Sequence, residues 1–233
     1  MKRIVLKLSG EVLANDNKEK IYDMKFVDEI AGAIKEAVDE GYEIGLVVGA
    51  GNIWRGREGV DMDRVDADRM GMLATVINAI CMKDAIKRAG GDAVVMTSVP
   101  MEPLAERYSG ERAIEALESG KVVVFGSGLG IPFLSTDTTG AVRSAEIKAD
   151  AMLMAKSVDY IYDDDPEKNE EATKLENVKA SAVLGMNLKA LDATATAFCL
   201  STGMPIKVFG LKNPSDILRA IHGEVDGTVV IPE

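Results

Sequence analysis

The feature that most constrains this chain of 233 residues is the alternation of short apolar runs with longer helical patterns. Most of the short runs are continuously apolar and rich in β-branched residues, which predicts strands covered on both faces. The predicted strands are Ile4–Leu8, Ile44–Val48, Ala93–Met96, Val122–Phe125, Ala151–Ala155, Ile206–Phe209 and Thr228–Ile231.

Helical patterns separate these runs. Apolar residues recur at helical spacing between Val27 and Val38, and longer patterns cover Val65–Ala89 and Asp137–Ala149. A further helix start lies at 213–218, with Asn213 as the predicted cap and Pro214 in the first position. Strands that alternate with helices in this way predict an α/β fold with a mainly parallel sheet.

Composition excludes several classes of function. The formal net charge of −11 argues against nucleic acid or an anionic membrane as a partner, because both are bound mainly through Lys and Arg. The single histidine, His222, excludes His-rich zinc sites, and its position before Gly223 suits a cation at a helix C-terminus. Cys81 and Cys199 lie in apolar helical patterns and are expected to be reduced core residues.

The chain shows no leader pattern and no apolar run near the ~20 residues that span a bilayer. We therefore expect a cytoplasmic protein with no membrane partner. The most polar stretch, Asp163–Lys174, either divides a larger N-terminal part from a smaller C-terminal part or is a surface loop of one domain.

Three predicted strands end in loops that are rich in glycine and small polar residues. They are "KLSGE" from Lys7, "VVGAGNIWRG" from Val47 and "FGSGLGIPFLSTDTTG" from Phe125. Glycines expose backbone N–H groups to anions, and parallel strands bring such loops to one sheet edge. Each loop alone is explained as a turn or a helix cap, but together they predict an anion or nucleotide site.

The residue types in these loops suit phosphate chemistry. Lys7 and Arg55 supply charge, Ser135 and Thr136 supply hydroxyls, and Asp137 could hold a metal or orient a cation. The familiar nucleotide motifs are absent: there is no Gly-x-x-x-x-Gly-Lys-[Ser/Thr], no Gly-x-Gly-x-x-Gly after Phe125 and no protein-kinase set. Phosphate chemistry here must therefore use another arrangement.

Six segments, in order and spacing, resemble bacterial-type uridylate (UMP) kinases of the amino-acid kinase superfamily. They are "KLSGE", "VVGAGNIWRG", "DRMGMLATVINAICMKDAI", "PFLSTDTTGAVRSAEIKAD", "VDYIYDDDP" and "ALDATATAF". The resemblance covers essentially the whole chain, and "GMLATVINA" separates UMP kinases from the glutamate, aspartate and carbamate kinases.

The resemblance implies transfer of the ATP γ-phosphoryl group to UMP with Mg²⁺, giving UDP and ADP in pyrimidine nucleotide biosynthesis. It implies a three-layer α/β/α sandwich in which residues 1–150 hold UMP and residues 151–233 hold the nucleoside of ATP, all within one domain of residues 1–233. It also implies a homohexamer that responds to GTP and UTP as effectors.

The resemblance also assigns residues to roles. The implied catalytic residues are Lys7, Arg55, Asp137 and Asp192, with Asp137 also the metal ligand. The implied ATP-binding residues are Lys7, Leu8, Ser9, Gly10, Gly51, Arg55, Lys156, Tyr162 and Asp165. The implied UMP-binding residues are Gly49, Ala50, Asp68, Leu129, Gly130, Ile131, Pro132, Phe133, Leu134, Ser135 and Thr136.

The chain departs from the family in three places that bear on substrates or effectors. Ala50 interrupts what is usually a run of three glycines, so it narrows the approach of phosphate or requires a negative φ. Leu129 and Ile131 replace polar side chains near the acceptor, and 11–24 lacks a glycine-rich stretch tied to the GTP response. Two alternatives therefore stay open: a superfamily kinase with another acceptor, and a nucleotide-binding regulator without turnover.

Overall fold

The computed structural model describes residues 2–15, 19–54, 61–156, 158–164, 169, 171–186 and 191–233. Its central element is a sheet of nine strands in the order β4-β3-β5-β2-β1-β6-β10-β11-β9. The strands are β1 (Arg3–Leu8), β2 (Glu43–Val48), β3 (Ala93–Thr97), β4 (Glu106–Arg107), β5 (Val122–Gly126), β6 (Ala151–Lys156), β9 (Asn177–Lys179), β10 (Ile206–Gly210) and β11 (Gly227–Ile231). Every neighbouring pair is parallel except β10 and β11.

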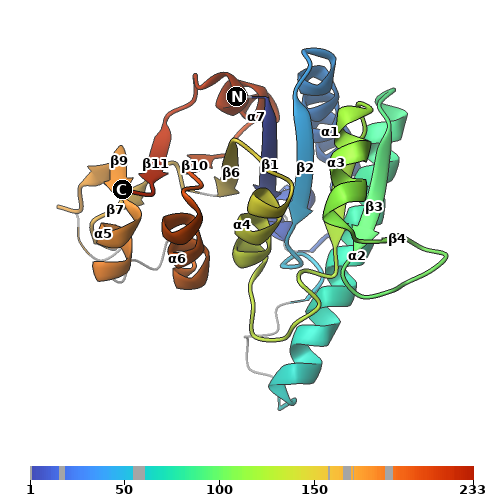
Figure 1. Ribbon diagram of the computed structural model, residues 1–233, viewed down its shortest axis with the longest axis horizontal. Helices are drawn as coiled ribbons and strands as arrows, with labels where there is room; N and C mark the ends of the chain where they lie inside the picture. The colour runs from blue at the N-terminus through green and yellow to red at the C-terminus, as the bar shows by residue number, and fades with distance from the viewer. Residues whose placement is uncertain are drawn as a thin grey trace.

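Helices cover both faces of the sheet and form the outer layers of an α/β/α arrangement (Figure 1). One face carries α1 (Met24–Asp39), α2 (Arg64–Arg88) and α7 (Ser215–His222). The other carries α3 (Gly110–Glu118), α4 (Thr136–Glu146) and α6 (Ala193–Thr202), with α5 (Ala180–Gly185) against α6. A short 3-10 helix, η1 (Gly10–Ala14), follows β1, and β7 (Ile161–Tyr162) pairs with β8 (Lys174–Leu175) in a separate ribbon.

Successive side chains along a strand point to opposite faces of the sheet, so each strand contributes residues to the cores on both faces. In β1, Ile4, Leu6 and Leu8 pack with α1, α2 and α7, whereas Val5 packs with the core beneath α3. Lys7 is on the same side of β1 as Val5, because successive strand side chains point to opposite faces. This alternation directs a lysine toward the layer that contains α4.

All seven predicted strands and the predicted α/β class are confirmed, with boundaries that shift by one residue at most. The helices at α1, α2 and α4 are also confirmed. His222 ends α7 as expected, because Gly223 follows it in the left-handed conformation with φ 81°. Both cysteines are free, but only Cys199 is buried, whereas Cys81 is half-buried.

The predicted cap of α7 is wrong. The helix begins at Ser215, with Pro214 rather than Asn213 in the cap position. The Asp216 carboxylate accepts the backbone N–H groups of Lys212 and Asn213 at 3.1 and 2.9 Å, so a side chain inside the first turn satisfies the amides before the helix. Among the described residues, no helix is both long enough and apolar enough to cross a membrane.

Candidate functional site

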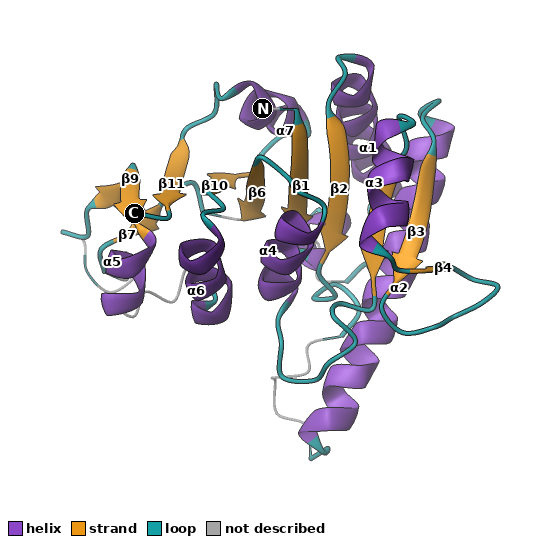
Figure 2. Cartoon of the chain, viewed as in Figure 1, coloured by secondary structure: helices purple, strands orange, loops and turns teal. Residues whose placement is uncertain are grey.

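The candidate site lies where four central strands end. β5, β2, β1 and β6 are neighbours, so the loops after them meet at the carboxyl edge of the sheet, beside the point where the chain order reverses. The N-terminal half of α2 projects past this edge (Figure 2). The predicted convergence of the three loops is therefore confirmed.

The first two loops touch each other. A Cβ added to Gly10 would lie 2.5 Å from the Gly51 nitrogen and 2.7 Å from the Gly49 oxygen, so no side chain fits at this position. The Gly49 N–H also donates to the Leu8 carbonyl at 2.9 Å. The bare backbone thus allows the loops after β1 and β2 to form one surface.

A buried ionic cluster lies beside these loops. Lys7 Nζ is 2.7 Å from one Asp137 oxygen, and Lys156 Nζ is 3.4 Å from the other. The Lys7, Lys156 and Asp137 side chains are 7%, 19% and 14% exposed. Two ammonium groups therefore share the Asp137 carboxylate close to the two loops.

Burial and neighbouring charge act against each other in this cluster. Burial alone raises the pKa of the Asp137 carboxyl, but the ammonium groups of Lys7 and Lys156 outweigh it and hold the pKa below its ordinary value. Burial lowers the pKa of Lys156, the Asp137 carboxylate opposes this shift, and Lys7 adds to it. Asp137 therefore stays ionised at neutral pH.

The close packing of α4 on the sheet positions Asp137. A Cβ at Gly140 would lie 2.2 Å from the Met152 methyl carbon, so glycine allows the first turn of α4 to approach β6. Ser135 caps this helix by accepting the Thr138 N–H at 3.1 Å. The dipole of α4 favours an anion at the same end.

Asp192 joins the cluster through a threonine rather than through a lysine contact. Its Oδ1 accepts the Thr138 hydroxyl at 3.0 Å and the Ala195 N–H at 3.0 Å, which caps α6. The Asp192 charge also favours the ionised form of Lys156. The structure thus gives Asp192 a role in positioning α4 against α6.

A pocket of about 130 Å³ opens between α2 and the loops that follow β2 and β5. Asp68, Thr75 and Thr136 contribute polar groups, and Trp54 and Leu134 contribute apolar surface. The Trp54 ring is held in place, because its Nε1 donates to the Ala67 carbonyl at 2.9 Å. The combination of a carboxylate, hydroxyls and apolar walls is typical of a small-molecule site.

The predicted acceptor loop forms one wall of this pocket. The Phe133 N–H donates to Asp68 Oδ2 at 2.8 Å, and Arg64 Nε donates to Asp68 Oδ1 at 2.9 Å. Ile131 and Phe133 are 58% and 64% exposed, so the loop presents apolar side chains to solvent. Leu129, Gly130, Pro132 and Ser135 are half-buried.

Ala50 also lines the pocket. Its φ is not among the positive values found in the described residues, so the methyl group fits without backbone strain. Its carbonyl accepts the N–H groups of Ile53 and Trp54 at 2.9 and 2.8 Å. The alanine is therefore accommodated without a positive φ.

The sequence did not identify a hydrogen-bonding network behind the second loop. Asn78 is fully buried in α2, and its Nδ2 donates to the Gly49 carbonyl at 2.7 Å and to Asn52 at 2.8 Å. Its Oδ1 accepts the Tyr22 hydroxyl at 2.8 Å. A polar residue at a core position of a helical pattern is the signal that could have revealed it.

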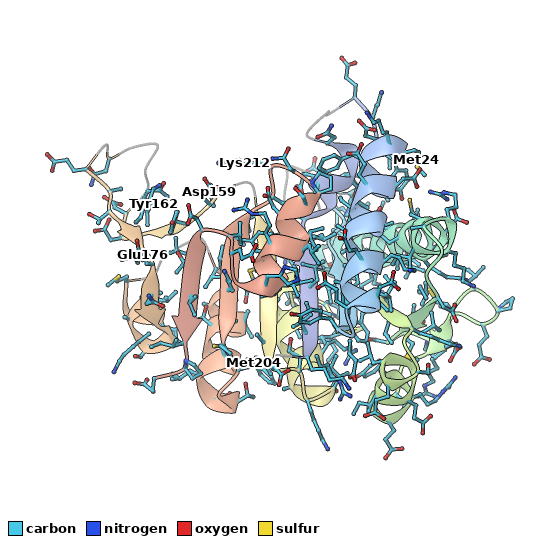
Figure 3. The ribbon with its side chains drawn as sticks, turned by 90° about the horizontal axis from the view of Figure 1, so that it is seen from above. Met24, Asp159, Tyr162, Glu176, Met204 and Lys212 are labelled. Carbon is cyan, nitrogen blue, oxygen red and sulfur yellow. The ribbon has the colours of Figure 1, made fainter. Side chains whose placement is uncertain are left out.

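Other predicted site residues lie outside the cluster or outside the described ranges. Tyr162 lies on β7, near the Asp159–Lys212 ion pair of 2.6 Å (Figure 3). Arg55 and Asp165 lie outside the described residues. The structure thus brings Lys7, Asp137 and Lys156 together beside the loops after β1 and β2, and places Tyr162 on β7 in the C-terminal part.

The chemistry of the cluster bears on the implied metal. Among the described residues, no group of three His, Cys, Asp or Glu side chains is placed to hold an ion. Mg²⁺ that arrives with nucleotide phosphates needs only one or two carboxylates, because phosphate oxygens and waters complete its shell. Asp137 at the phosphate loops fits that limited requirement.

Comparison with known proteins agrees with this geometry. The sequence profile of the amino acid kinase family matches residues 2–210. The crystal structure of a UMP kinase from Bacillus anthracis superposes with a TM-score of 0.94 at 35% identity, covering 100% of this chain and 96% of that one. That of a UMP kinase from Ureaplasma parvum gives 0.92 at 34% identity, covering 99% and 98%. The chain therefore belongs to the amino acid kinase family.

Proposed function

We propose that this protein is a UMP kinase, a nucleoside monophosphate kinase that transfers the γ-phosphoryl group of ATP to UMP. The observation that carries the proposal is the Lys7–Asp137–Lys156 cluster at the junction of two bare phosphate loops, next to the Asp68 pocket. Similarity to UMP kinases over the whole chain supports UMP as the acceptor.

The chain's own groups suit this transfer. The phosphate of a nucleoside monophosphate is largely a dianion at neutral pH, with a second pKa of about 6, so its oxygen attacks phosphorus without a general base. Lys7 neutralises charge on the phosphoryl group as its bond to ADP breaks and the bond to UMP forms. The backbone amide of Gly10 binds phosphate oxygens, and Asp137 holds Lys7 in place.

Mg²⁺ enters this scheme with ATP. Asp137 would hold it, and the bound ion supplies neutralisation of phosphate charge. The other polar groups have assigned tasks that do not depend on the ion: Asp68 accepts hydrogen bonds from the acceptor ribose, and Ser135 orders the amides that face its phosphate.

The proposal divides the chain between the two nucleotides. The N-terminal part, residues 1–150, contributes the Asp68 pocket and so binds UMP. The C-terminal part, residues 151–233, binds the nucleoside of ATP, with Tyr162 and Asp165 at its base and ribose. The position of Tyr162 beyond the end of β6, the strand that carries Lys156, supports this division.

An acceptor panel tests the proposal. Purified protein with Mg²⁺ and ATP should show its highest kcat/KM with UMP among UMP, CMP, dTMP, AMP and small acids such as glutamate and aspartate. A higher kcat/KM with another acceptor would establish the superfamily kinase with a shifted substrate. Binding of both UMP and ATP without any UDP would establish a regulator that lacks turnover.

We further propose that the chain assembles as a homohexamer. Four side chains on one stripe of α2 are 38–54% exposed: Met70, Leu73, Ile77 and Ile80. Their spacing of three and four residues makes a continuous apolar seam, which is suited to a second helix. Light scattering of Leu73→Glu should give a lower mass than wild type, and an unchanged mass would exclude this seam from the contacts.

We propose that nucleotide effectors bind a second cavity, of about 490 Å³, whose lining includes residues of β3 and β4. Five basic and three acidic side chains line it, which leaves an excess of positive charge: Lys83, Lys87, Arg107, Arg112 and Lys121 against Asp92, Glu102 and Glu106. Titration with GTP and UTP should change kcat or KM in wild type, and Lys83→Ala should weaken the response. An equal response in the variant would place the effectors elsewhere.

A further inference from the structure

Arg143 is a buried cation that the proposed chemistry does not use. It lies on α4 with its side chain only 5% exposed. Its Nη1 pairs with Glu146, and its Nη2 donates to the Ser98 hydroxyl at 2.6 Å. The guanidinium carbon also lies 3.6 Å from the centre of the Tyr108 ring. A guanidinium removed from water in this way is stabilised by the carboxylate and by the aromatic face.

The contact with Ser98 continues into the acceptor pocket. Ser98 Oγ donates to the Gly128 carbonyl at 2.7 Å, and Gly128 lines the pocket that contains Asp68. Arginine can only donate hydrogen bonds, so the Ser98 hydroxyl must accept from Arg143. Its single proton is then directed to Gly128. The charge of Arg143 thus strengthens a bond to the wall of the pocket.

The acceptor loop needs such support because its backbone is unusual. Ser127, Gly128, Gly130 and Phe133 have φ values of 59°, 55°, 74° and 70°, all in the left-handed region. For the two residues that are not glycine this conformation costs about 1–2 kcal/mol each. The conformation therefore persists only if surrounding contacts hold the loop.

Those contacts act at both ends of the loop. At its start, the Ser127 N–H donates to the Thr75 hydroxyl at 3.0 Å, and the Ser127 hydroxyl accepts the Val99 N–H at 3.1 Å. At its end, the loop runs directly into α4 through the Ser135 cap. Arg143 is on the same helix and is linked to Gly128 near the start of the loop through Ser98, so α4 acts on both ends of the loop.

We propose that Arg143 is a positioning residue for the acceptor: through Ser98 it fixes the Gly128 carbonyl, and with it the shape of the pocket wall that UMP contacts. This inference rests on the proposed function, because it takes the Asp68 pocket as the acceptor site. Arg143 sets the affinity for UMP without touching the nucleotide and has no direct effect on ATP binding.

Three variants separate this role from a general structural one. Ser98→Ala removes the relay and leaves the charge of Arg143 in place. Arg143→Lys keeps the charge but loses the planar guanidinium group, which donates hydrogen bonds to Glu146 and Ser98 at the same time. Tyr108→Phe is the matched control, because it removes the 2.8 Å bond from the Tyr108 hydroxyl to Glu146 and leaves the relay intact.

The measurement is kcat and the KM values for UMP and ATP in each variant, with the melting temperature alongside. Loss of one hydrogen bond should raise KM for UMP about threefold to tenfold in Ser98→Ala. KM for ATP and kcat should stay near wild type, because the lost interaction is equal in the ground and transition states. Arg143→Lys should raise KM for UMP by no more than Ser98→Ala does, because Arg143 acts on the pocket only through Ser98. Tyr108→Phe should change only the melting temperature.

The outcomes are distinguishable. If the wild-type protein makes no UDP, the proposed function is refuted, and so is the positioning role of Arg143 that depends on it. With active wild type, a folded Ser98→Ala with unchanged KM for UMP would overturn the inference alone. Equal rises in KM for UMP and ATP would also overturn it, because they would indicate a general structural effect. If Arg143→Lys does not fold, Ser98→Ala decides the question.

Discussion

Replacement of Asp137 by Asn should destabilise the fold, because it leaves two buried ammonium groups without the carboxylate that they share. At an effective dielectric constant of about 20, the attraction of Asp137 to Lys7 at 2.7 Å and to Lys156 at 3.4 Å amounts to about 6 and 5 kcal/mol. Most of this attraction offsets the desolvation of the three charges. Removing the shared carboxylate from such a buried group should therefore cost about 3–5 kcal/mol of folding free energy.

For a chain of this size, that loss corresponds to a decrease of about 6–20 °C in melting temperature. Calorimetry at pH 7 would measure it. The control is Asp39→Asn, which breaks the exposed Lys35–Asp39 pair on α1 and should change the melting temperature by at most a few degrees. If Asp137→Asn melted within a few degrees of wild type, as the control does, the ion cluster would not be buried as described.

The pH dependence of the same variant gives a second test. Burial already lowers the pKa of Lys156, and loss of the Asp137 carboxylate removes the main opposing cause. The unfolded chain then binds more protons than the folded variant between this lowered pKa and the ordinary value of 10.5. Stability relative to wild type should therefore rise with pH in that window. A gap that is constant from pH 7 to 9.5 would contradict this.

Three further predictions concern other residues of the site and fold. Lys7→Ala should fold and lose about 10²- to 10³-fold in kcat in a steady-state assay, because Lys7 acts on charge that develops in the transition state; near-normal kcat would remove its role. Asp68→Ala should raise KM for UMP about 10- to 100-fold, since a charged hydrogen-bond acceptor is lost, and an unchanged KM would move the acceptor elsewhere. The hydrogen bond to Glu40 raises the pKa of His222 above its ordinary value of 6.5. His222→Gln should therefore lower the melting temperature most at a pH below 6.5, and the loss should disappear as the pH rises through the raised pKa of His222. Melting curves of wild type and variant from pH 5 to 9 would check this, and a difference that grows with pH would contradict it.

Much of the fold could be predicted because most of its strands are short apolar runs in a sheet that helices cover on both faces. The place of Lys7 at the site could also be predicted, because Lys7 begins the segment "KLSGE" at the end of the first predicted strand. The two-residue strands β4, β7 and β8 could not be predicted, because their pairing partners rather than their own residues define them.

The supporting residues of the site could not be predicted either. Arg143 occupies an ordinary position in a helical pattern, and only the tertiary structure places it between Tyr108 and Ser98. The polar Asn78 at a core position of α2 could have been noticed, but its contacts could not be predicted, because its partners in the second loop and at Tyr22 are distant in sequence. Sequence patterns reveal residues that face a ligand more readily than residues that hold them.

The most direct test of the proposed activity is the stoichiometry of the reaction. Purified wild type and Lys7→Ala are incubated with ATP, Mg²⁺ and UMP, and the nucleotides are separated and quantified over time. The account predicts that wild type forms one UDP for each ADP and that Lys7→Ala forms neither at a comparable rate. ADP without UDP in wild type, or equal rates in the two proteins, would contradict it.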